Sequence, residues 1–234
     1  MEELFSRSEL IYGKEAMDKL NKCHAAIFGV GGVGGYVVEA LARTGVGHFT
    51  LIDNDTVALS NFNRQIIATK ETLGKYKVDV MKERILSIND KAVVKVKKMF
   101  VLPENIDEID FSQFDYIVDA IDTVKAKLAI IAKANELNIP MISSMGAGNK
   151  LNPMGFIVTD INKSDTGPLA KKIRYELRQM GIKKLKVVYS KEQPVELKDQ
   201  LFNENNKPIP GSNAFVPSAC GLLIASEVIN DLIK

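Results

Sequence analysis

The feature that most constrains this chain is a glycine-rich turn between a short apolar run and a helical pattern. Residues 24–29 (HAAIFG) form the apolar run, which predicts a buried strand. Apolar side chains then recur at helical spacing until Gly45, which is expected to end the helix. The turn between them contains four glycines that allow a tight bend: Gly29, Gly31, Gly32 and Gly34. A helix that begins after such a turn presents free N–H groups and a partial positive charge, so the sequence predicts a nucleotide phosphate there.

The rest of the chain alternates between strand and helix patterns. Up to about residue 150 we expect strands at 48–53, 92–99, 115–120 and 140–144, and helices at 74–89 and 123–137. Beyond it we expect strands at 155–160 and 186–190 around a helix at 168–180, and a closing helix at 217–233. Residues 191–216 show no pattern and are expected to form a lid or a substrate-guiding loop. The alternation predicts an α/β fold: a doubly wound, Rossmann-like, mostly parallel sheet with a C-terminal extension containing further strands and helices.

The composition is that of an ordinary globular chain. Hydrophobic residues make up 46% of the 234 residues and the net charge is +2, so wholesale disorder is excluded. The two cysteines, Cys23 and Cys220, exclude a disulfide framework and a cysteine-only zinc site, and fit a reducing cytosol. The first residues lack the apolar core of a signal peptide, and the apolar runs are short of the ~20 residues that a membrane span needs. We therefore expect a cytoplasmic protein without a membrane segment.

Polar side chains after the glycine turn favour ATP over a nicotinamide cofactor. Asp53 ends the next predicted strand, where a carboxylate can accept a hydrogen bond from a ribose hydroxyl. Asn61 and Arg64 follow it, and Lys77 begins the next helix, so that two cations are available for phosphate oxygens. Asp122 follows the fourth predicted strand at the same sheet edge, where it can bind Mg²⁺ together with phosphate and water. Each residue alone is more simply explained as a surface charge, and only the combination predicts an ATP and magnesium site.

The segments GVGGVG, LIDNDTVALSNFNRQ, GKYK and DAIDT together resemble the ubiquitin-activating-enzyme-like (ThiF/MoeB-like) adenylation superfamily, which activates a carboxylate by attaching it to AMP. By that resemblance, the nucleotide site comprises Gly31, Gly34, Asp53, Asn61, Arg64, Lys77 and Asp122. The segment LFSRSELIYG also matches a family arginine, Arg7, which would reach across a homodimer into the partner's ATP site. The resemblance thus implies ATP and Mg²⁺ as cofactors and catalytic roles for Arg64, Lys77, Asp122 and Arg7.

Motifs in the second half narrow the resemblance. SSMGAGNKLNP at 143–153, VTDINKSDTGPLAKKIRYELRQMGI at 158–182 and VVYSKEQP at 187–194 are similar to those of the tRNA threonylcarbamoyladenosine dehydratases. Members of that family use ATP to cyclise N6-threonylcarbamoyladenosine in tRNA to its oxazolone form, through a carboxyl-adenylate. The resemblance implies a ligase-like adenylating cyclase, whose ring closure needs no protein nucleophile. It also implies two regions in one compact domain: an ATP-binding adenylation region at 1–160, and a basic, tRNA-binding extension with a crossover loop at 161–234.

The basic residues are concentrated after residue 170. Residues 171–186 carry seven basic side chains and one acidic side chain, a net charge of +6, whereas the rest of the chain carries −4. At helical spacing, Lys171, Arg174 and Arg178 fall on one exposed face opposite an apolar stripe. A clustered basic face suits a phosphate backbone, and a solvated helix face is the plainer alternative. We expect this segment to bind tRNA through Lys171, Lys172, Arg174, Arg178, Lys183 and Lys184.

Three other functions stay open at this stage. An activator of a small sulfur-carrier protein would adenylate a Gly-Gly carboxyl terminus, although this chain lacks the CxxC motifs common in such enzymes. A nicotinamide-dependent oxidoreductase would respond to NAD and not to ATP, and a binding module would show no turnover. Cys23 is expected in the core, and Cys220 is better explained as a packed cysteine than as a reactive thiol at a helix N-terminus. A sulfur or redox accessory protein is a further candidate partner, although no residue identifies one.

Overall fold

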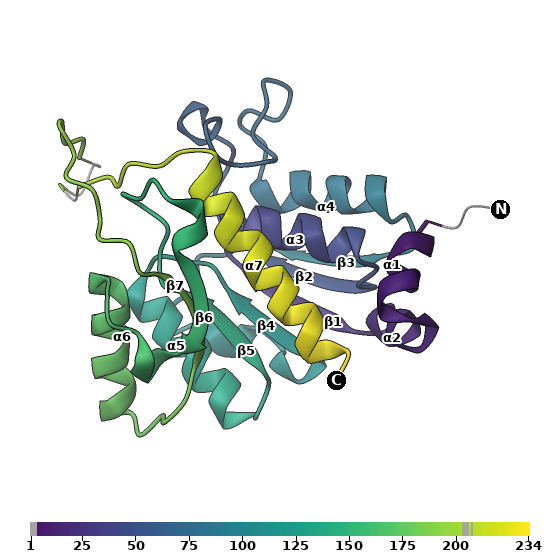
Figure 1. The fold of residues 1–234 in the computed structure, drawn as a ribbon. Coiled ribbons are helices and arrows are strands. Elements are labelled where there is room, and N and C mark those ends of the chain that lie inside the picture. Colours follow the sequence, from purple (N-terminus) through teal and green to yellow (C-terminus); the bar gives the residue numbers. More distant parts are fainter. Residues whose placement is uncertain (1–3, 203–205, 207) are drawn as a thin grey trace.

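The computed structural model describes residues 4–202, 206 and 208–234. These residues form a seven-stranded sheet in the order β3-β2-β1-β4-β5-β7-β6, in which β6 runs antiparallel to β7 and the other pairs are parallel (Figure 1). The strands are β1 (His24–Phe28), β2 (His48–Ile52), β3 (Val93–Lys97), β4 (Tyr116–Asp119), β5 (Met141–Ser144), β6 (Phe156–Asp160) and β7 (Lys186–Ser190). The sheet confirms the doubly wound, mostly parallel α/β fold predicted from the alternating pattern.

Helices connect most of the strands. They are α1 (Ser6–Tyr12), α2 (Lys14–Leu20), α3 (Gly34–Arg43), α4 (Lys77–Ile88), α5 (Val124–Glu136), α6 (Pro168–Gln179) and α7 (Phe215–Leu232). The last five lie where helical patterns were expected, but α4 begins three residues later than the pattern, because Gly74 is left-handed and Tyr76 is extended. The two short N-terminal helices were not expected. No side chain of α1 is buried in this chain, so α1 lacks the inward apolar stripe by which a helix is recognised.

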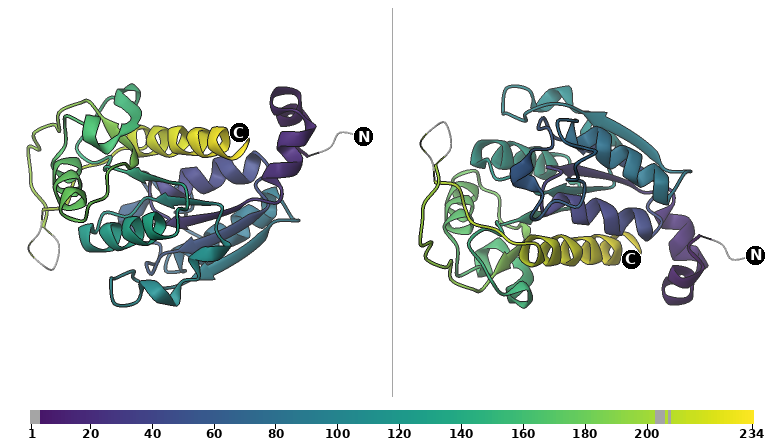
Figure 2. Two further views of the ribbon diagram at one scale, coloured as in Figure 1. Left: turned by 90° about the horizontal axis from the view of Figure 1, so that it is seen from below. Right: turned by 90° about the horizontal axis from the view of Figure 1, so that it is seen from above.

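Helices cover both faces of the sheet (Figure 2). Alternate strand residues point to opposite faces, as the pleat requires. Ala25 and Ile27 of β1 join the core formed with α3, α4 and α7, whereas Ala26 and Phe28 join the core formed with α5. A third cluster packs α6 against α5 and β7. The expected boundary at residue 160 does not divide the fold, because β7 from the second region lies inside the same sheet as the strands of the first. The division into two functional regions stays a prediction.

The strand order reverses at the centre of the sheet. β1 pairs with β2 on one side and with β4 on the other, and the chain crosses between these two halves. In an open parallel sheet, the carboxyl ends of the strands separate at such a reversal and leave a crevice for a ligand. The glycine turn follows β1, and residues 120–123 follow β4, so both predicted parts of the site lie at this crevice.

The last helix packs closely on the first helix of the nucleotide half. α7 crosses α3 so tightly that a Cβ on Gly221 would lie 2.4 Å from the carbonyl oxygen of Val33. Among the described residues, α7 is the one helix long and apolar enough to cross a membrane, with 18 residues and a mean hydropathy of 1.3. Half of it is buried inside the fold, where Val216, Ile224 and Val228 join the main core.

Candidate nucleotide-binding site

The glycine turn is held between β1 and the loop after β4. Gly29 has a φ of +88°, and a Cβ there would lie 2.9 Å from the Ala120 carbonyl oxygen. A Cβ on Gly34 would lie 1.8 Å from the Gly29 carbonyl oxygen. These two glycines are therefore required by backbone packing. Gly31 and Gly32 instead lie beside the side chains of Gln65 and Arg64, and leave the N-terminal turn of α3 open to a phosphate.

Asp53 fastens the glycine turn to the next strand. Its Oδ2 accepts a hydrogen bond from Val30 N at 2.7 Å, and its Oδ1 accepts one from Asp55 N at 2.8 Å. Each carboxylate oxygen has a second lone pair, so the carboxylate can still accept a ribose hydroxyl. Binding of a ribose hydroxyl by Asp53 stays a prediction. The structure shows that Asp53 also holds the glycine turn through Val30 N.

Arg64 lies along the glycine turn as expected. Its Cγ is 3.3 Å from the position of a Cβ on Gly32, and its Nη1 donates to Ser60 O at 2.7 Å and to Asn63 Oδ1 at 2.8 Å. Burial lowers the pKa of the Arg64 guanidinium from its ordinary value, but an arginine remains charged at neutral pH. Asn61 is buried, and its Oδ1 accepts Ala58 N at 3.0 Å, so its carbonyl end shapes the loop that carries Arg64.

Lys77 is buried and paired. Its Nζ donates to Asp55 Oδ2 at 2.7 Å, and its backbone N–H donates to Asp55 O at 3.0 Å. The exposed fractions of the two side chains are 7% for Lys77 and 58% for Asp55. The sequence indicated no role for Asp55, because an acid two residues after Asp53 looks like any surface carboxylate. The structure shows it holding the predicted phosphate-binding cation.

Asp122 is exposed in the loop between β4 and α5, beside the glycine turn. The preceding Ile121 side chain lies 3.0 Å from the position of a Cβ on Gly29. No group of three or more His, Cys, Asp or Glu side chains that could hold a metal occurs in the described parts of the chain. A lone carboxylate at a phosphate-binding turn still fits Mg²⁺, which is commonly held by one or two carboxylates together with phosphate oxygens and water.

Gln65 lies beside the glycine turn and was not predicted from the sequence. It is buried beside the turn, its Nε2 is 3.8 Å from the position of a Cβ on Gly31, and its Oε1 has no partner among the described residues. A buried amide with an unpaired carbonyl is costly unless something donates to it. The one feature of the sequence that could have pointed to Gln65 is its position directly after Arg64.

The segment before α7 contacts the site. Asn63 Nδ2 donates to Ser212 O at 3.0 Å, and the side chain of Pro217 lies 3.3 Å from the position of a Cβ on Gly32. Asn213 Nδ2 donates to Lys150 O at 3.0 Å, which ties the segment to the loop after β5. Residues 212–217 therefore lie beside the glycine turn and the loop that carries Arg64. Residues 203–205 and 207 of the predicted loop at 191–216 lie outside the described residues, and the role of that loop as a lid or crossover stays a prediction.

Arg7 lies at the other end of the molecule from its own glycine turn. α1 and α2 pack where α3 ends: Phe5 Cδ2 is 3.5 Å from the position of a Cβ on Gly45. The ten residues of α3 separate that end from the glycine turn by roughly 15 Å. Helix α1, which carries Arg7, lies at the end of α3 opposite the glycine turn (Figure 1), so Arg7 does not join its own chain's site.

The prediction that Arg174 lies on an exposed basic face is wrong. Its Nη1 donates to Ser164 Oγ at 2.7 Å, to Ser164 O and, at 3.4 Å, to Ile161 O. The helical spacing was correct, but the turn at 161–164 packs against that side of α6 and takes up the guanidinium. Lys171, Lys172 and Arg178 remain exposed on α6.

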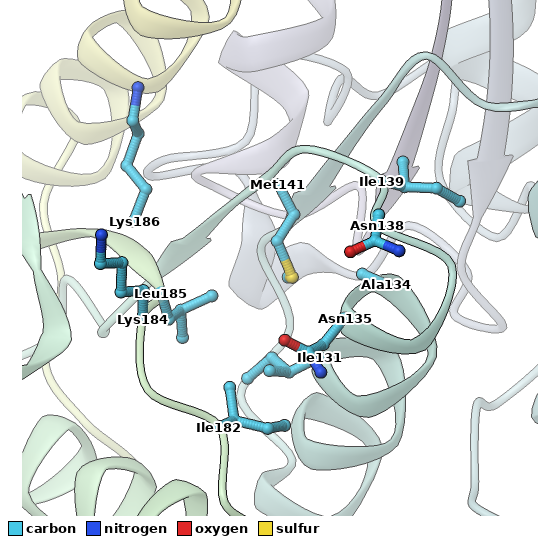
Figure 3. A pocket seen from close by; sticks show the side chains of 10 residues that line it. All are labelled: Ile131, Ala134, Asn135, Asn138, Ile139, Met141, Ile182, Lys184, Leu185 and Lys186. Atoms are coloured by element: carbon cyan, nitrogen blue, oxygen red, sulfur yellow. The ribbon is translucent and has the colours of Figure 1, made fainter.

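The basic segment extends over two edges of the sheet. α6 begins beside the nucleotide edge, where Leu169 lies 3.8 Å from the position of a Cβ on Gly146. Lys183 and Lys184 precede β7 and so lie at the opposite, amino edge. A pocket of about 210 Å³ lies there, and Figure 3 shows Lys184 and Lys186 among the residues that line it. The segment is thus an elongated surface and not a single patch.

Both cysteines are buried. Burial raises the pKa of the Cys220 thiol to about 12, and its Sγ lies 3.6 Å from Ser144 Oγ. Burial also raises the pKa of Cys23. Neither environment favours a thiolate nucleophile, which agrees with the prediction that Cys23 and Cys220 are packed in the core.

Comparison with known proteins gives consistent results. A tRNA threonylcarbamoyladenosine dehydratase of Bacillus subtilis (strain 168) is 42% identical over 98% of this chain and 94% of its own length. The dehydratase of Escherichia coli (strain K12) is 41% identical over 74% of this chain and 65% of its own length. The motif-based resemblance is thereby confirmed.

Solved structures give the same result for the fold. The crystal structure of the E. coli enzyme TcdA, a tRNA N6-threonylcarbamoyladenosine dehydratase, in complex with ATP matches with a TM-score of 0.89 at 34% identity. The match covers 98% of this chain and 93% of that one, and the AMP complex matches equally well. E. coli MccB with ATP shares the fold at a TM-score of 0.71 and 22% identity. The ThiF family model matches residues 5–234, so the chain belongs to the ThiF family.

Proposed function

We propose that this chain is an ATP-dependent tRNA threonylcarbamoyladenosine dehydratase. The observation that carries the proposal is the convergence of the glycine turn, Arg64 and Lys77 at one sheet edge, in a chain that resembles such dehydratases over nearly its whole length. The site supplies cations and free N–H groups for a triphosphate and offers no thiolate nucleophile. It is suited to adenylate formation followed by ring closure within the substrate.

In the first step, a carboxylate oxygen of the threonyl group forms a bond to the α-phosphorus of ATP. The bond from that phosphorus to the bridging oxygen breaks, and pyrophosphate leaves with the electron pair. Arg64 and Lys77 neutralise the charge that develops on the phosphate oxygens, and the N-terminal turn of α3 adds N–H donors. Catalysis of this kind is mostly orientation plus charge neutralisation.

In the second step, the carbamoyl oxygen of the same nucleoside attacks the activated carbonyl carbon. The ring closes, AMP leaves, and the carbamoyl nitrogen gives up its proton. Both reacting groups belong to one substrate, so their proximity replaces a protein nucleophile. The net result is loss of one water from the nucleoside, with ATP converted to AMP and pyrophosphate.

We propose Mg²⁺ as the second cofactor, with Asp122 as its protein ligand. When bound, the ion would add positive charge at the α- and β-phosphates. The fit depends on the exposed carboxylate beside the glycine turn, and the phosphates and water would complete the coordination.

We also propose the macromolecular partners. tRNA would lie along α6, contacting Lys171, Lys172 and Arg178, with Lys183 and Lys184 meeting phosphates farther away. A second copy of the chain would bring its Arg7 to the ATP site, since Arg7 lies too far from its own site. We further propose that the enzyme works in the cytoplasm and that a sulfur or redox accessory protein is a candidate partner.

The decisive experiment uses the intact protein, ATP, Mg²⁺ and tRNA bearing N6-threonylcarbamoyladenosine. The tRNA is then digested and its nucleosides are weighed. ATP-dependent loss of the mass of one water supports the proposal. No loss, with pyrophosphate exchange seen only with a protein ending in Gly-Gly, would support the sulfur-carrier activator instead. A thermal response to NAD and none to ATP would support the oxidoreductase.

A further inference from the structure

A fully buried ion pair lies directly beneath the loop that carries Asp122. Lys127 Nζ of α5 donates to Asp119 Oδ2 at 2.7 Å, and both side chains are 0% exposed. Ser143 Oγ of β5 donates to the same oxygen at 2.5 Å and accepts from Lys127 Nζ at 3.2 Å. Three elements, β4, β5 and α5, are thereby joined at the carboxyl edge of the sheet.

The cluster Asp119–Lys127–Ser143 joins the two ends of the loop 120–123. Asp119 is the last residue of β4, and its Oδ1 accepts Ile121 N at 3.3 Å. Lys127 lies in the first turns of α5, and its backbone N–H donates to Thr123 O at 3.0 Å. The side chains of residues 119 and 127 therefore bond across the segment 120–123.

The other side of the loop is held by the glycine turn. Ala120 N donates to Phe28 O at 2.8 Å, and its carbonyl oxygen lies 2.9 Å from the position of a Cβ on Gly29. Ile121 contacts the same position at 3.0 Å. Asp122 is thus an exposed carboxylate on a loop that contacts the Asp119–Lys127–Ser143 cluster on one side and the glycine turn on the other.

Stability alone does not account for such a cluster. Removing two charges from water is costly, and apolar side chains of similar volume often replace a buried ion pair without loss of stability. Groups behind a metal ligand, in contrast, orient it, and their loss weakens metal binding or activity by about 10–100-fold. The position of the cluster, three residues from Asp122 and bonded to its loop, matches the second role.

We infer that Lys127 and Ser143 are positioning residues that, through Asp119, hold Asp122 in place for the magnesium–ATP complex. The inference rests on the proposed role of Asp122. It predicts that neutralising Lys127 or removing the Ser143 hydroxyl weakens the response of ATP binding to Mg²⁺, although neither side chain reaches the nucleotide.

The test measures ATP binding by calorimetry across a Mg²⁺ titration, with no tRNA present. Lys127→Met and Ser143→Ala are compared with Asp122→Asn and with Arg84→Met. The last variant breaks the contact of Arg84 Nη2 with Glu39 Oε1, at 2.9 Å, between α3 and α4, away from the loop. Ser143→Ala keeps the ion pair, so it remains informative if Lys127→Met does not fold.

We expect Ser143→Ala to raise the Mg²⁺ concentration at half-saturation by several-fold, and Lys127→Met by about tenfold or more, approaching Asp122→Asn. Arg84→Met should leave it unchanged even where it lowers the melting temperature. Wild-type half-saturation in Ser143→Ala, or a wild-type ATP affinity that does not depend on Mg²⁺, would overturn the inference. Because no tRNA is present, a failure of dehydration would count against the proposed function alone.

Discussion

The ammonium of Lys77 donates to the carboxylate of Asp55 across 2.7 Å at the start of α4, so this cation is held in place before any phosphate arrives. We predict that Lys77→Met lowers the rate of ATP–pyrophosphate exchange by about 100-fold, because one of the cations facing the transition state is lost. Asp55→Asn should lower it less, by about tenfold, since the cation remains but loses its orientation. Equal effects of the two variants on exchange would contradict this division of roles.

Arg64 lies along the glycine turn with Nη1 already donating to Ser60 O and Asn63 Oδ1. A lysine cannot keep both contacts and also present a planar fork to phosphate oxygens. We predict that Arg64→Lys lowers kcat for dehydration by about tenfold or more, measured from the mass change of the nucleoside. Arg43→Lys is the matched control, because Arg43 is largely exposed and pairs with Glu39 away from the site. A wild-type rate in Arg64→Lys would argue against phosphate contact.

Lys171 and Lys172 are exposed on α6 and are expected to contact phosphates of tRNA. We predict that Lys171→Glu with Lys172→Glu weakens tRNA binding without altering ATP binding. The slope of log affinity against log salt should fall by about 1.5, because each lost phosphate contact contributes about 0.7–0.9. Lys91→Glu with Lys95→Glu, at the β3 end of the sheet, is the charge-matched control. Unchanged tRNA affinity at low salt would contradict the prediction.

Arg174 is predicted to behave differently from its neighbours on α6. Its contacts with Ser164 and Ile161 hold the turn before the helix. Arg174→Met should lower the free energy of unfolding by about 1 kcal/mol or more, because carbonyl acceptors lose a charged donor. The folded variant should keep its tRNA affinity, which separates a structural arginine from a tRNA contact.

Arg7 can be tested by mixing two inactive variants. If Arg7 serves the partner's site, a dimer of Arg7→Ala and Arg64→Ala chains contains one intact site of two. Random mixing makes half of the dimers mixed, so about a quarter of the wild-type activity should return. Each variant alone should stay inactive. If Arg7 acted within its own chain, mixing would restore nothing.

Because Cys220 is buried, we predict that the protein loses stability at alkaline pH but resists alkylation of this thiol. Burial raises the pKa of its thiol from the ordinary 9.0 to about 12, so the thiol stays protonated in the folded state at pH 8. Native enzyme should therefore keep its activity in iodoacetamide at that pH. The unfolded chain ionises this thiol near pH 9 and the folded protein only near pH 12. The protonated thiol therefore contributes its full stability below pH 9, and the free energy of unfolding falls as the pH rises from 9 to 12. Cys220→Ala should flatten this fall in melting temperature. Rapid alkylation of the native protein at pH 8 would contradict the assignment.

Local patterns were sufficient to predict much of this protein. The glycine turn, the alternation of strands and helices, and the positions of Asp53, Arg64 and Asp122 all depend on neighbours in the chain. Each of these is set by backbone sterics or by periodicity over a few residues. The family resemblance added the reaction and the substrate, which no periodicity contains.

Tertiary structure decided the rest, because the deciding contacts join side chains on different structural elements. The pairing of Lys77 with Asp55, the capture of Arg174 by Ser164, and the cluster beneath Asp122 depend on which elements pack together. Helical spacing predicts which side chains share a face, but not which loop covers that face. Sequence therefore determined the fold and the reaction class, and the packing determined which charged side chains are free to meet a ligand.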